Sequence, residues 1–297
     1  MMYTKLTMKK NQRLKNLLIT NNNIYVTKIS LIMLQCILII LATAVLCPFF
    51  YMVITSFKAP HEIFRHLDMP ARIHWENYYA VFKGGKFFMA LLNTLTIVSI
   101  SLVFLIIISS VASYPLSRIK LSFFTFVYFV FLGGIIIPFQ TSMVPIFKII
   151  KGLGLMNTRI ALILLNTASA LPISIMIYVG FIKTVPVELE EAAIIDGCSN
   201  LRLFGEIIFP LLKPATITII VINIFSMWND FLGPLLFIHS GSKKPLITMI
   251  YSFQGERSSD WGPIFALCTL STIPLIAIFL SFQKHFYKGI VAGAVKG

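Results

Sequence analysis

Residues 29–57 read ISLIMLQCILIILATAVLCPFFYMVITSF, and no charged residue interrupts them between Lys28 and Lys58. About 20 apolar residues are enough for a helix to cross a lipid bilayer. A cleaved signal peptide has a shorter apolar core that ends at a small-residue cleavage site, whereas here the small-residue triplet at 42–44 lies inside the apolar run. The stretch is therefore predicted to be a retained transmembrane helix.

Five further windows of this kind follow, and only Asp230 interrupts one of them. The chain is 57% hydrophobic and 12% charged, with a mean hydropathy of +0.86, whereas a soluble domain is about 25% charged. The sequence therefore predicts an all-α, polytopic membrane protein. Its six spans are expected at about 29–54, 88–113, 123–147, 160–182, 215–237 and 263–282.

The formal net charge is +14, from 25 Lys and Arg against 11 Asp and Glu. The segment 1–28 carries a cluster of Lys and Arg with no acidic residue, and the first segment often sets the orientation of a membrane protein. We therefore expect a cytosolic basic segment at 1–28, a permease domain at 29–283 and a cytosolic tail at 284–297, with both termini in the cytosol. Basic residues of this kind indicate contact with anionic membrane lipid, and no nucleic-acid partner is expected.

The segment 184–213, between the fourth and fifth spans, has the signals of a helical hairpin. Pro186 suits the first turn of a helix, and Gly197 suits the residue after it, where a positive φ is needed. Ser199 is expected to cap a second short helix over about 200–208, which Pro210 would end. Carboxylates gather in the first turn of the first helix, where its dipole stabilises negative charge: Glu188, Glu190 and Glu191.

This hairpin has two interpretations. Small side chains at Ala192 and Ala193 permit close approach of another protein, and carboxylates pair well with arginine on a partner. The pattern is also that of a solvated amphipathic connector between two spans. The residues alone leave both open.

The spacing of Glu191-Ala192-Ala193, Gly197, Ile207 and Pro210 resembles the pattern of the permease subunits of bacterial ABC importers. Asp196 before the glycine also matches, and Phe209 departs from the family, which has leucine there. The resemblance extends to four further short stretches and to the tail 288–297. These stretches are Thr55-Ser56-Phe57-Lys58, Asn93-Thr94, Ile137-Pro138 and Trp228-Asn229-Asp230. Together they are similar to the carbohydrate-uptake branch, and within it to the smaller maltose-transporter permease, a type I importer.

The resemblance implies a protein of the bacterial inner membrane that imports a carbohydrate, expected to be an oligosaccharide. Its partners would be a second homologous permease, two cytosolic ATP-binding subunits and an extracytoplasmic solute-binding protein. In that family the loop corresponding to 238–262 contacts the docked binding protein. The residues implied to couple the chain to the ATPase are Glu190, Glu191, Ala192, Ala193, Asp196, Gly197, Ile207 and Pro210.

No catalytic site or bound cofactor is expected in this chain. It has no Gly-rich P-loop with its Lys-Ser/Thr ending, so ATP and Mg²⁺ would be bound by the partner ATPase. No metal site is expected either, because the histidines lack ligand spacing.

Polar residues inside the apolar windows are candidates for the substrate path, since polar groups are costly in a membrane and usually functional. They are Gln140, Asn166, Asn223, Ser226, Asn229 and Asp230. The alternative for each is a role in holding helices together. For Asp230, a place at the membrane interface and proton coupling also remain open.

Two other classes of function are open to a polytopic membrane protein. A stand-alone secondary carrier for a small polar solute would need internal repeats and paired intramembrane charges. A polytopic membrane enzyme would need clustered catalytic groups near one membrane face. The chain has one acid inside an apolar window and no evident repeat, so the importer permease is preferred.

Overall fold

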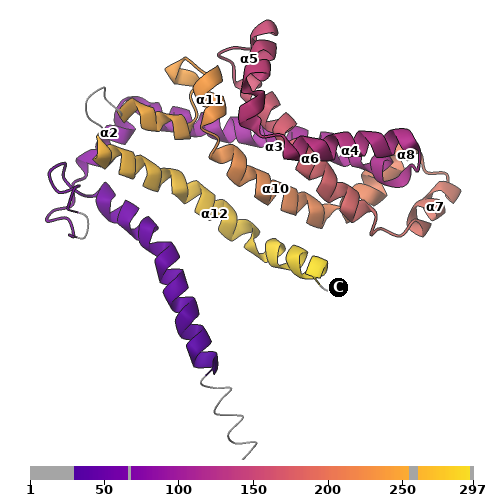
Figure 1. The fold of residues 1–297 in the computed structure, drawn as a ribbon, viewed down its shortest axis with the longest axis horizontal. Helices are drawn as coiled ribbons and strands as arrows, with labels where there is room; N and C mark the ends of the chain where they lie inside the picture. The colour runs from indigo at the N-terminus through magenta and orange to yellow at the C-terminus, as the bar shows by residue number, and fades with distance from the viewer. Residues whose placement is uncertain (1–29, 66–67, 254–259, 295–297) are drawn as a thin grey trace, which may run out of the picture. The chain divides into compact units, whose positions relative to one another are not determined.

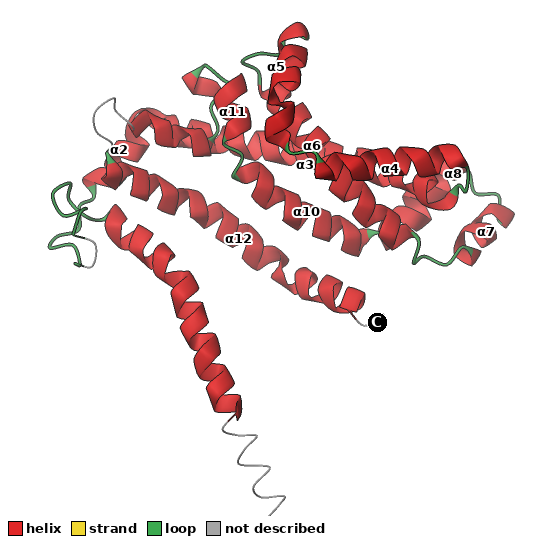
Figure 2. Cartoon of the chain, in the orientation of Figure 1, coloured by secondary structure: helices red, strands yellow, loops and turns green. Residues whose placement is uncertain are grey.

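A computed structural model describes residues 30–65, 68–253 and 260–294 of the chain. Figure 2 shows that the elements of this described part are all helical, with no strand. Four of its helices are long and apolar enough to cross a membrane, and six spans result if two bent helix pairs are each counted as one. The predicted all-α, polytopic membrane fold is therefore confirmed. The chain divides into two compact units, Met1–Thr55 and Ser56–Gly297.

The first unit is represented in the described residues by one helix, Ser30–Ser56, which runs one residue past the unit boundary. It coincides with the apolar stretch at 29–57. The backbone of this stretch satisfies its own hydrogen bonds as a helix, which is what a lipid environment requires. The predicted basic segment at 1–28 lies outside the described residues.

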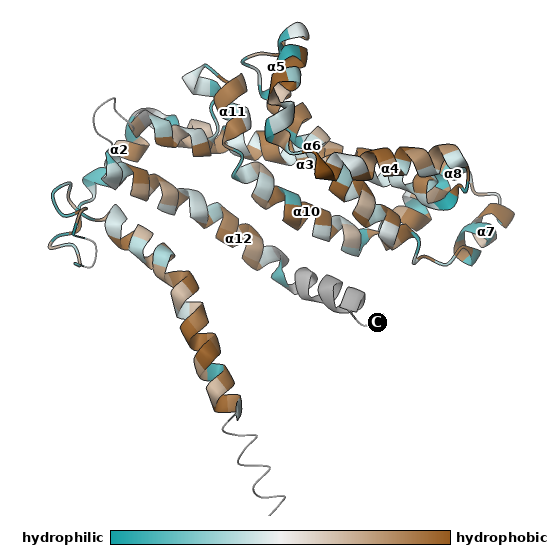
Figure 3. Ribbon diagram, viewed as in Figure 1, coloured by the Kyte–Doolittle hydropathy of each residue, from teal (hydrophilic) through white to brown (hydrophobic). Residues whose placement is uncertain are grey.

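The second unit contains the remaining elements, which Figure 1 shows in order along the chain. The helices of the first half are α2 (Glu76–Phe82), η1 (Lys83–Gly85), α3 (Lys86–Arg118), α4 (Ser122–Ile136), η2 (Phe139–Ser142), α5 (Met143–Gly152) and α6 (Arg159–Ile182). Those of the second half are α7 (Glu188–Ile195), α8 (Asn200–Arg202), η3 (Leu203–Ile208), α9 (Phe209–Leu211), α10 (Lys213–Trp228), α11 (Leu232–Phe237), η4 (Gly241–Lys243), η5 (Leu246–Phe253) and α12 (Trp261–Ala294). Figure 3 shows apolar colours along the long helices and hydrophilic colours in the segment before α2 and around α7 and α8.

α3 and α6 pack against each other through small hydroxyl side chains. The Ser101 hydroxyl donates to the carbonyl of Ile163 at 3.4 Å, and the Thr167 hydroxyl donates back to the Ser101 carbonyl at 3.4 Å. Further along, Ser113 donates to the carbonyl of Ile175 at 3.3 Å. Small polar residues let two membrane helices approach closely and hydrogen-bond across their interface. This packing places α3 at the centre of the unit.

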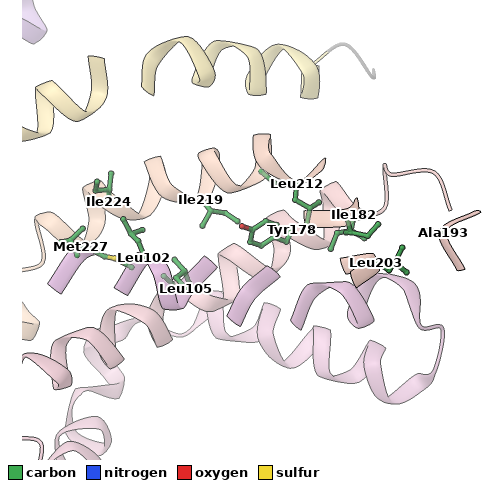
Figure 4. Packing of buried hydrophobic residues seen from close by; sticks show 14 residues of the cluster. Leu102, Leu105, Tyr178, Ile182, Ala193, Leu203, Leu212, Ile219, Ile224 and Met227 are labelled. Carbon is green, nitrogen blue, oxygen red and sulfur yellow. The ribbon is translucent and has the colours of Figure 1, made fainter. Parts of the chain in front are cut away.

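The largest apolar cluster follows this helix pair and joins it to α10 and to the hairpin. Figure 4 shows the cluster extending from Met227 and Ile224 through Tyr178 to Leu203 and Ala193. α3, α6, α10 and the hairpin after α6 therefore share one continuous core.

Two of the predicted spans are interrupted. In the window 123–147, α4 ends at Ile136 and the chain bends by 101° before η2 and α5. Pro138 explains the break, because proline has no backbone N–H to continue the helix and disfavours helical backbone in the residue before it. In the window 215–237, α10 ends at Trp228 and α11 begins only at Leu232. The predicted tail at 284–297 continues α12 as far as Ala294.

Candidate functional site

The hairpin after α6 forms a helix, a glycine turn and a second helical segment. α7 ends at Ile195, and Gly197 adopts φ +80°, as expected for the residue that turns the chain there. The second segment runs from Asn200 to Leu211, and a 69° bend separates it from α10. It contains the π-helical turn η3.

Two details of this hairpin differ from the sequence prediction. The side chain of Ser199 makes no capping hydrogen bond, although Ser199 occupies the N-cap position of α8. Pro210 does not end the second segment at 208 but lies within it, at the start of α9. A proline in the first turn of a new helix loses no hydrogen bond, and α9 follows directly on the wider π-helical turn.

The inward face of α7 holds Glu190 and Ala193, which are both buried. Arg118, at the end of α3, donates from Nε to Glu190 Oε1 at 2.8 Å and from Nη2 to the carbonyl of Val185 at 2.7 Å. The Tyr114 hydroxyl donates to Glu190 Oε2 at 2.8 Å. The side chains of Arg118 and Glu190 are only 16% and 8% exposed. Glu190 is therefore engaged within the chain, and Ala193 packs on the chain's own core.

The outward face presents the other predicted coupling residues. Glu191, Ala192, Asp196 and Gly197 are exposed. The large apolar side chains of Ile195 and Leu201, on either side of the glycine turn, are 84% and 89% exposed. Apolar groups gathered at an exposed tip are typical of a surface that another protein covers. Of the remaining predicted residues, Ile207 is half-buried against the core and Pro210 is exposed.

A cavity of about 440 Å³, half of whose lining residues are polar, lies where the two interrupted spans meet α6. Its lining includes Phe139 and Gln140, just after the break at Pro138, and Asn229, Asp230 and Phe231, which form the break between α10 and α11. Irregular backbone at membrane depth is tolerated where it lines a cavity or is buried in protein. The other lining residues are Leu165, Asn166, Ser169, Ala170, Ser226, Met227 and Leu232.

The loop between α10 and α11 is held by its own polar side chains. Asp230 Oδ1 accepts the backbone N–H of Gly233 at 3.1 Å, and the Asn229 side chain donates to the carbonyl of Phe225 at 2.9 Å. A Cβ on Gly233 would overlap the Asp230 carboxylate, so a larger residue here would displace that side chain. Asp230 thus holds the start of α11 while it lines the cavity.

Five of the six predicted path residues line this cavity, and Asn223 does not. The Asn223 amide donates to the carbonyl of Ile219 at 2.8 Å and to the hydroxyl of Ser174, on α6, at 3.4 Å. It is buried and joins α10 to α6. The structure thus places Asn223 in the helix-holding role that the sequence left open as its alternative.

Several residues of these sites were not identified from the sequence. Tyr114 and Arg118 lie 76 and 72 residues before Glu190 in the chain, so only the fold brings them into contact with it. The aromatic residues Phe139 and Phe231 of the cavity were also missed, although both adjoin predicted polar residues. No group of three or more His, Cys, Asp or Glu that could hold a metal ion occurs among the described residues.

Several relatives match this chain along most of its length, among them two permeases that are named for sugars. The melibiose/raffinose/stachyose import permease protein MelC of Bacillus subtilis is 35% identical, over 87% of this chain and 94% of its own. The trehalose/maltose transport system permease protein MalG of Thermococcus litoralis is 33% identical, over 87% of this chain and 94% of its own.

A solved structure shares the fold. It is a bacterial ABC transporter involved in the import of the acidic polysaccharide alginate, and the comparison gives a TM-score of 0.73 at 22% identity, covering 87% of this chain and 97% of that one. Residues 78–291 match the family described as "Binding-protein-dependent transport system inner membrane component". The chain therefore belongs to this family of ABC transporter permeases.

Proposed function

We propose that this chain is the permease subunit of an ATP-driven, binding-protein-dependent importer of a small neutral oligosaccharide in the bacterial inner membrane. MelC and MalG, which each match 87% of the chain, are permeases named for sugars of this size. They give no support to the alternative of a stand-alone carrier. The partners would be a second permease, two cytosolic ATPase subunits that bind ATP and Mg²⁺, and an extracytoplasmic binding protein. Both termini would lie in the cytosol.

The observation that carries the proposal is the cavity at which both interrupted spans meet. Its polar side chains come from three spans, and two aromatic rings border them, a composition that suits a sugar with polar edges and apolar faces. The lining residues include one carboxylate and neither lysine nor arginine, which favours a neutral sugar over an acidic one. Phe231 stacks on Tyr251 of η5, with ring centroids 5.0 Å apart, so the cavity adjoins the loop after α11.

Filling the cavity tests this path. Ser226→Trp places a large side chain in the lining and should abolish sugar uptake by the reconstituted complex while the complex still assembles. Ile222→Trp is the matched control, since Ile222 lies on the same helix, α10, and is exposed outside the cavity lining. Uptake through the Ser226→Trp complex at the wild-type rate would exclude the cavity from the path.

The exposed tip of the hairpin is the proposed docking surface for the ATPase. Glu191 would pair with a basic residue of the ATPase, while Ile195 and Leu201 would be covered by its surface. Ile195→Asp should then weaken co-purification of the ATPase by about tenfold, as expected for loss of an apolar anchor. Phe64→Asp is the control, because Phe64 is 71% exposed in the loop before α2, which would lie on the other side of the membrane. Equal recovery of ATPase with both variants would exclude the tip as the docking surface.

A further inference from the structure

α3 is an unbroken helix of 33 residues that is hydrogen-bonded to other segments near both of its ends. At about 1.5 Å of rise per residue it is about 50 Å long, which is enough to cross a bilayer completely. The windows of α4 and α10 are interrupted, so neither offers an unbroken helix of this length. α3 is therefore one continuous helix between the two sides of the membrane, and its one internal proline, Pro115, lies in the last turn.

At the Arg118 end, the bonds hold the hairpin in a fixed direction. Arg118 reaches both the Glu190 carboxylate and the carbonyl of Val185, which lies in the segment before α7. Tyr114 occupies the second carboxylate oxygen. Charge-assisted bonds from a planar guanidinium are strong and directional. Any displacement of α7 therefore acts directly on the last turn of α3.

At the Lys86 end, the bonds hold the loop that follows α11. The Asn93 amide donates to the carbonyls of Ser242 at 2.9 Å and Lys244 at 3.0 Å. The backbone N–H of Leu246 donates to the Thr94 hydroxyl at 2.8 Å. Asn93 and Thr94 are both buried, so water does not compete with these bonds. The loop 242–246 is therefore tied to α3 by buried hydrogen bonds, as the hairpin is at the other end.

The apolar core also joins the hairpin to the helices, as Figure 4 shows, but in a different way. Apolar contact is non-directional, so helices joined by it alone can roll or slide while keeping their contact. Hydrogen bonds to the charged Glu190 and to defined carbonyls of the loop fix orientation as well as proximity. The hydrogen bonds at the two ends of α3, rather than the shared apolar core, therefore allow this helix to pass on a movement in a defined direction.

We propose that α3 transmits movement between the hairpin and the loop 242–246, and that Glu190 and Asn93 are positioning residues at its two ends. The inference rests on the proposed function, in which the ATPase drives the hairpin and the binding protein docks on the opposite side. Because coupling between two sites is reciprocal, a binding protein at the loop alters the hairpin through the same helix. Stimulation of ATP hydrolysis by the binding protein is then a measure of this connection.

The experiment uses the assembled transporter in lipid nanodiscs and compares ATP hydrolysis with and without sugar-loaded binding protein. Glu190→Gln removes the buried charge and should reduce the stimulation by about tenfold, as expected for weakened bonds to a charged group. Glu188→Gln is the matched control on α7, because Glu188 is exposed, and it should leave stimulation unchanged. Tyr114→Phe removes one bond and keeps the ion pair, so it should reduce stimulation about threefold and serves if Glu190→Gln fails to assemble.

A double variant tests whether the two ends act through one helix. Asn93→Ala alone should reduce stimulation about fivefold. Since both residues belong to one connection, Glu190→Gln with Asn93→Ala should be no lower than Glu190→Gln alone, within about twofold. A reduction equal to the product of the two single reductions would mean independent effects and would overturn the proposal.

A second readout separates transmission from simple structural damage. Ser242 is exposed, so Ser242→Cys, in a background without the four native cysteines, reports on the loop through its reaction with a membrane-impermeant maleimide. ATP with vanadate should change this reactivity fully in the wild type and in Glu188→Gln, by less in Tyr114→Phe and least in Glu190→Gln. A nucleotide-dependent change of wild-type size in the last two variants would overturn the proposal.

Measurements on the wild-type complex separate a failure of the proposed function from a failure of the proposed role of α3. If no neutral oligosaccharide with its binding protein stimulates the wild-type ATPase, the proposed function fails and this inference fails with it. If the wild type is stimulated and Glu190→Gln is stimulated equally, the proposed function stands and only the role of α3 is overturned.

Discussion

At the Lys86 end of α3, the neutral side chains of Asn93 and Thr94 hold the loop 242–246, whereas at the other end Arg118 and Tyr114 hold the carboxylate of Glu190. Both connections are buried, but their energetics differ. A neutral amide is moderately costly to bury and contributes modestly when bonded. A buried ion pair gains little over an apolar pair, yet breaking it leaves an uncompensated charge and costs far more. The hairpin connection is therefore the more sensitive of the two to substitution of one partner.

The largest expected effect follows from removing the cation alone. Arg118→Met leaves the Glu190 carboxylate buried without its ion pair, and should destabilise the complex by about 3–5 kcal/mol. The measurement is thermal unfolding of the detergent-solubilised complex. The control is Arg118→Met combined with Glu190→Met, which removes both charges and should recover most of the loss. Unfolding of the single variant at the wild-type temperature would contradict the burial of this charge.

A smaller effect is expected at the other end of α3. Asn93→Ala leaves the carbonyls of Ser242 and Lys244 without their amide donor, and should cost about 1–3 kcal/mol. Because the loop is a short segment, the loss should appear as faster hydrogen exchange over 241–246 while α7 keeps its wild-type exchange. Faster hydrogen exchange in α7 with unchanged exchange over 241–246 would contradict the role of Asn93 in holding this loop.

Loss of one neutral hydrogen bond at the same end should cost less free energy than Asn93→Ala does. Thr94→Val keeps the shape of the side chain but removes the acceptor of the Leu246 backbone N–H. The expected cost is about 1 kcal/mol, which corresponds to roughly fivefold faster exchange of the Leu246 amide. Exchange of that amide at the wild-type rate would show that the Thr94 hydroxyl does not protect it.

The smallest effect is expected for an ion pair that is not buried. Arg202 donates to Glu206 at 3.1 Å on the hairpin, one turn apart, and both side chains are more than 60% exposed. Exposed pairs of this kind gain little because water screens them. Arg202→Ala should leave the unfolding temperature unchanged within error, in contrast to Arg118→Met. A shift as large as that of Arg118→Met would show that burial is not what separates the two pairs.

The long apolar windows and the residues next to them were sufficient to predict the fold class and the glycine turn of the hairpin. They were insufficient at the two interruptions, because a window marks where the chain can lie in lipid and not where its helix breaks. The cavity shows the same limit. Five of the six polar residues proposed for the path do line it, but Asn223 faces α6, and polarity alone does not separate a lining residue from one that holds helices together.

The sequence by itself determined that the chain is a bundle of membrane helices with an acidic hairpin, because backbone groups in lipid must be satisfied within each helix and so leave long uncharged runs. Only the tertiary structure decided which of two adjacent glutamates faces inward. Successive residues of a helix point about 100° apart, so Glu190 and Glu191 cannot share a face. The chain's own Arg118 and Tyr114, brought there by α3, bind Glu190 and leave Glu191 exposed. That choice depends on contacts distant in sequence, which local patterns do not contain.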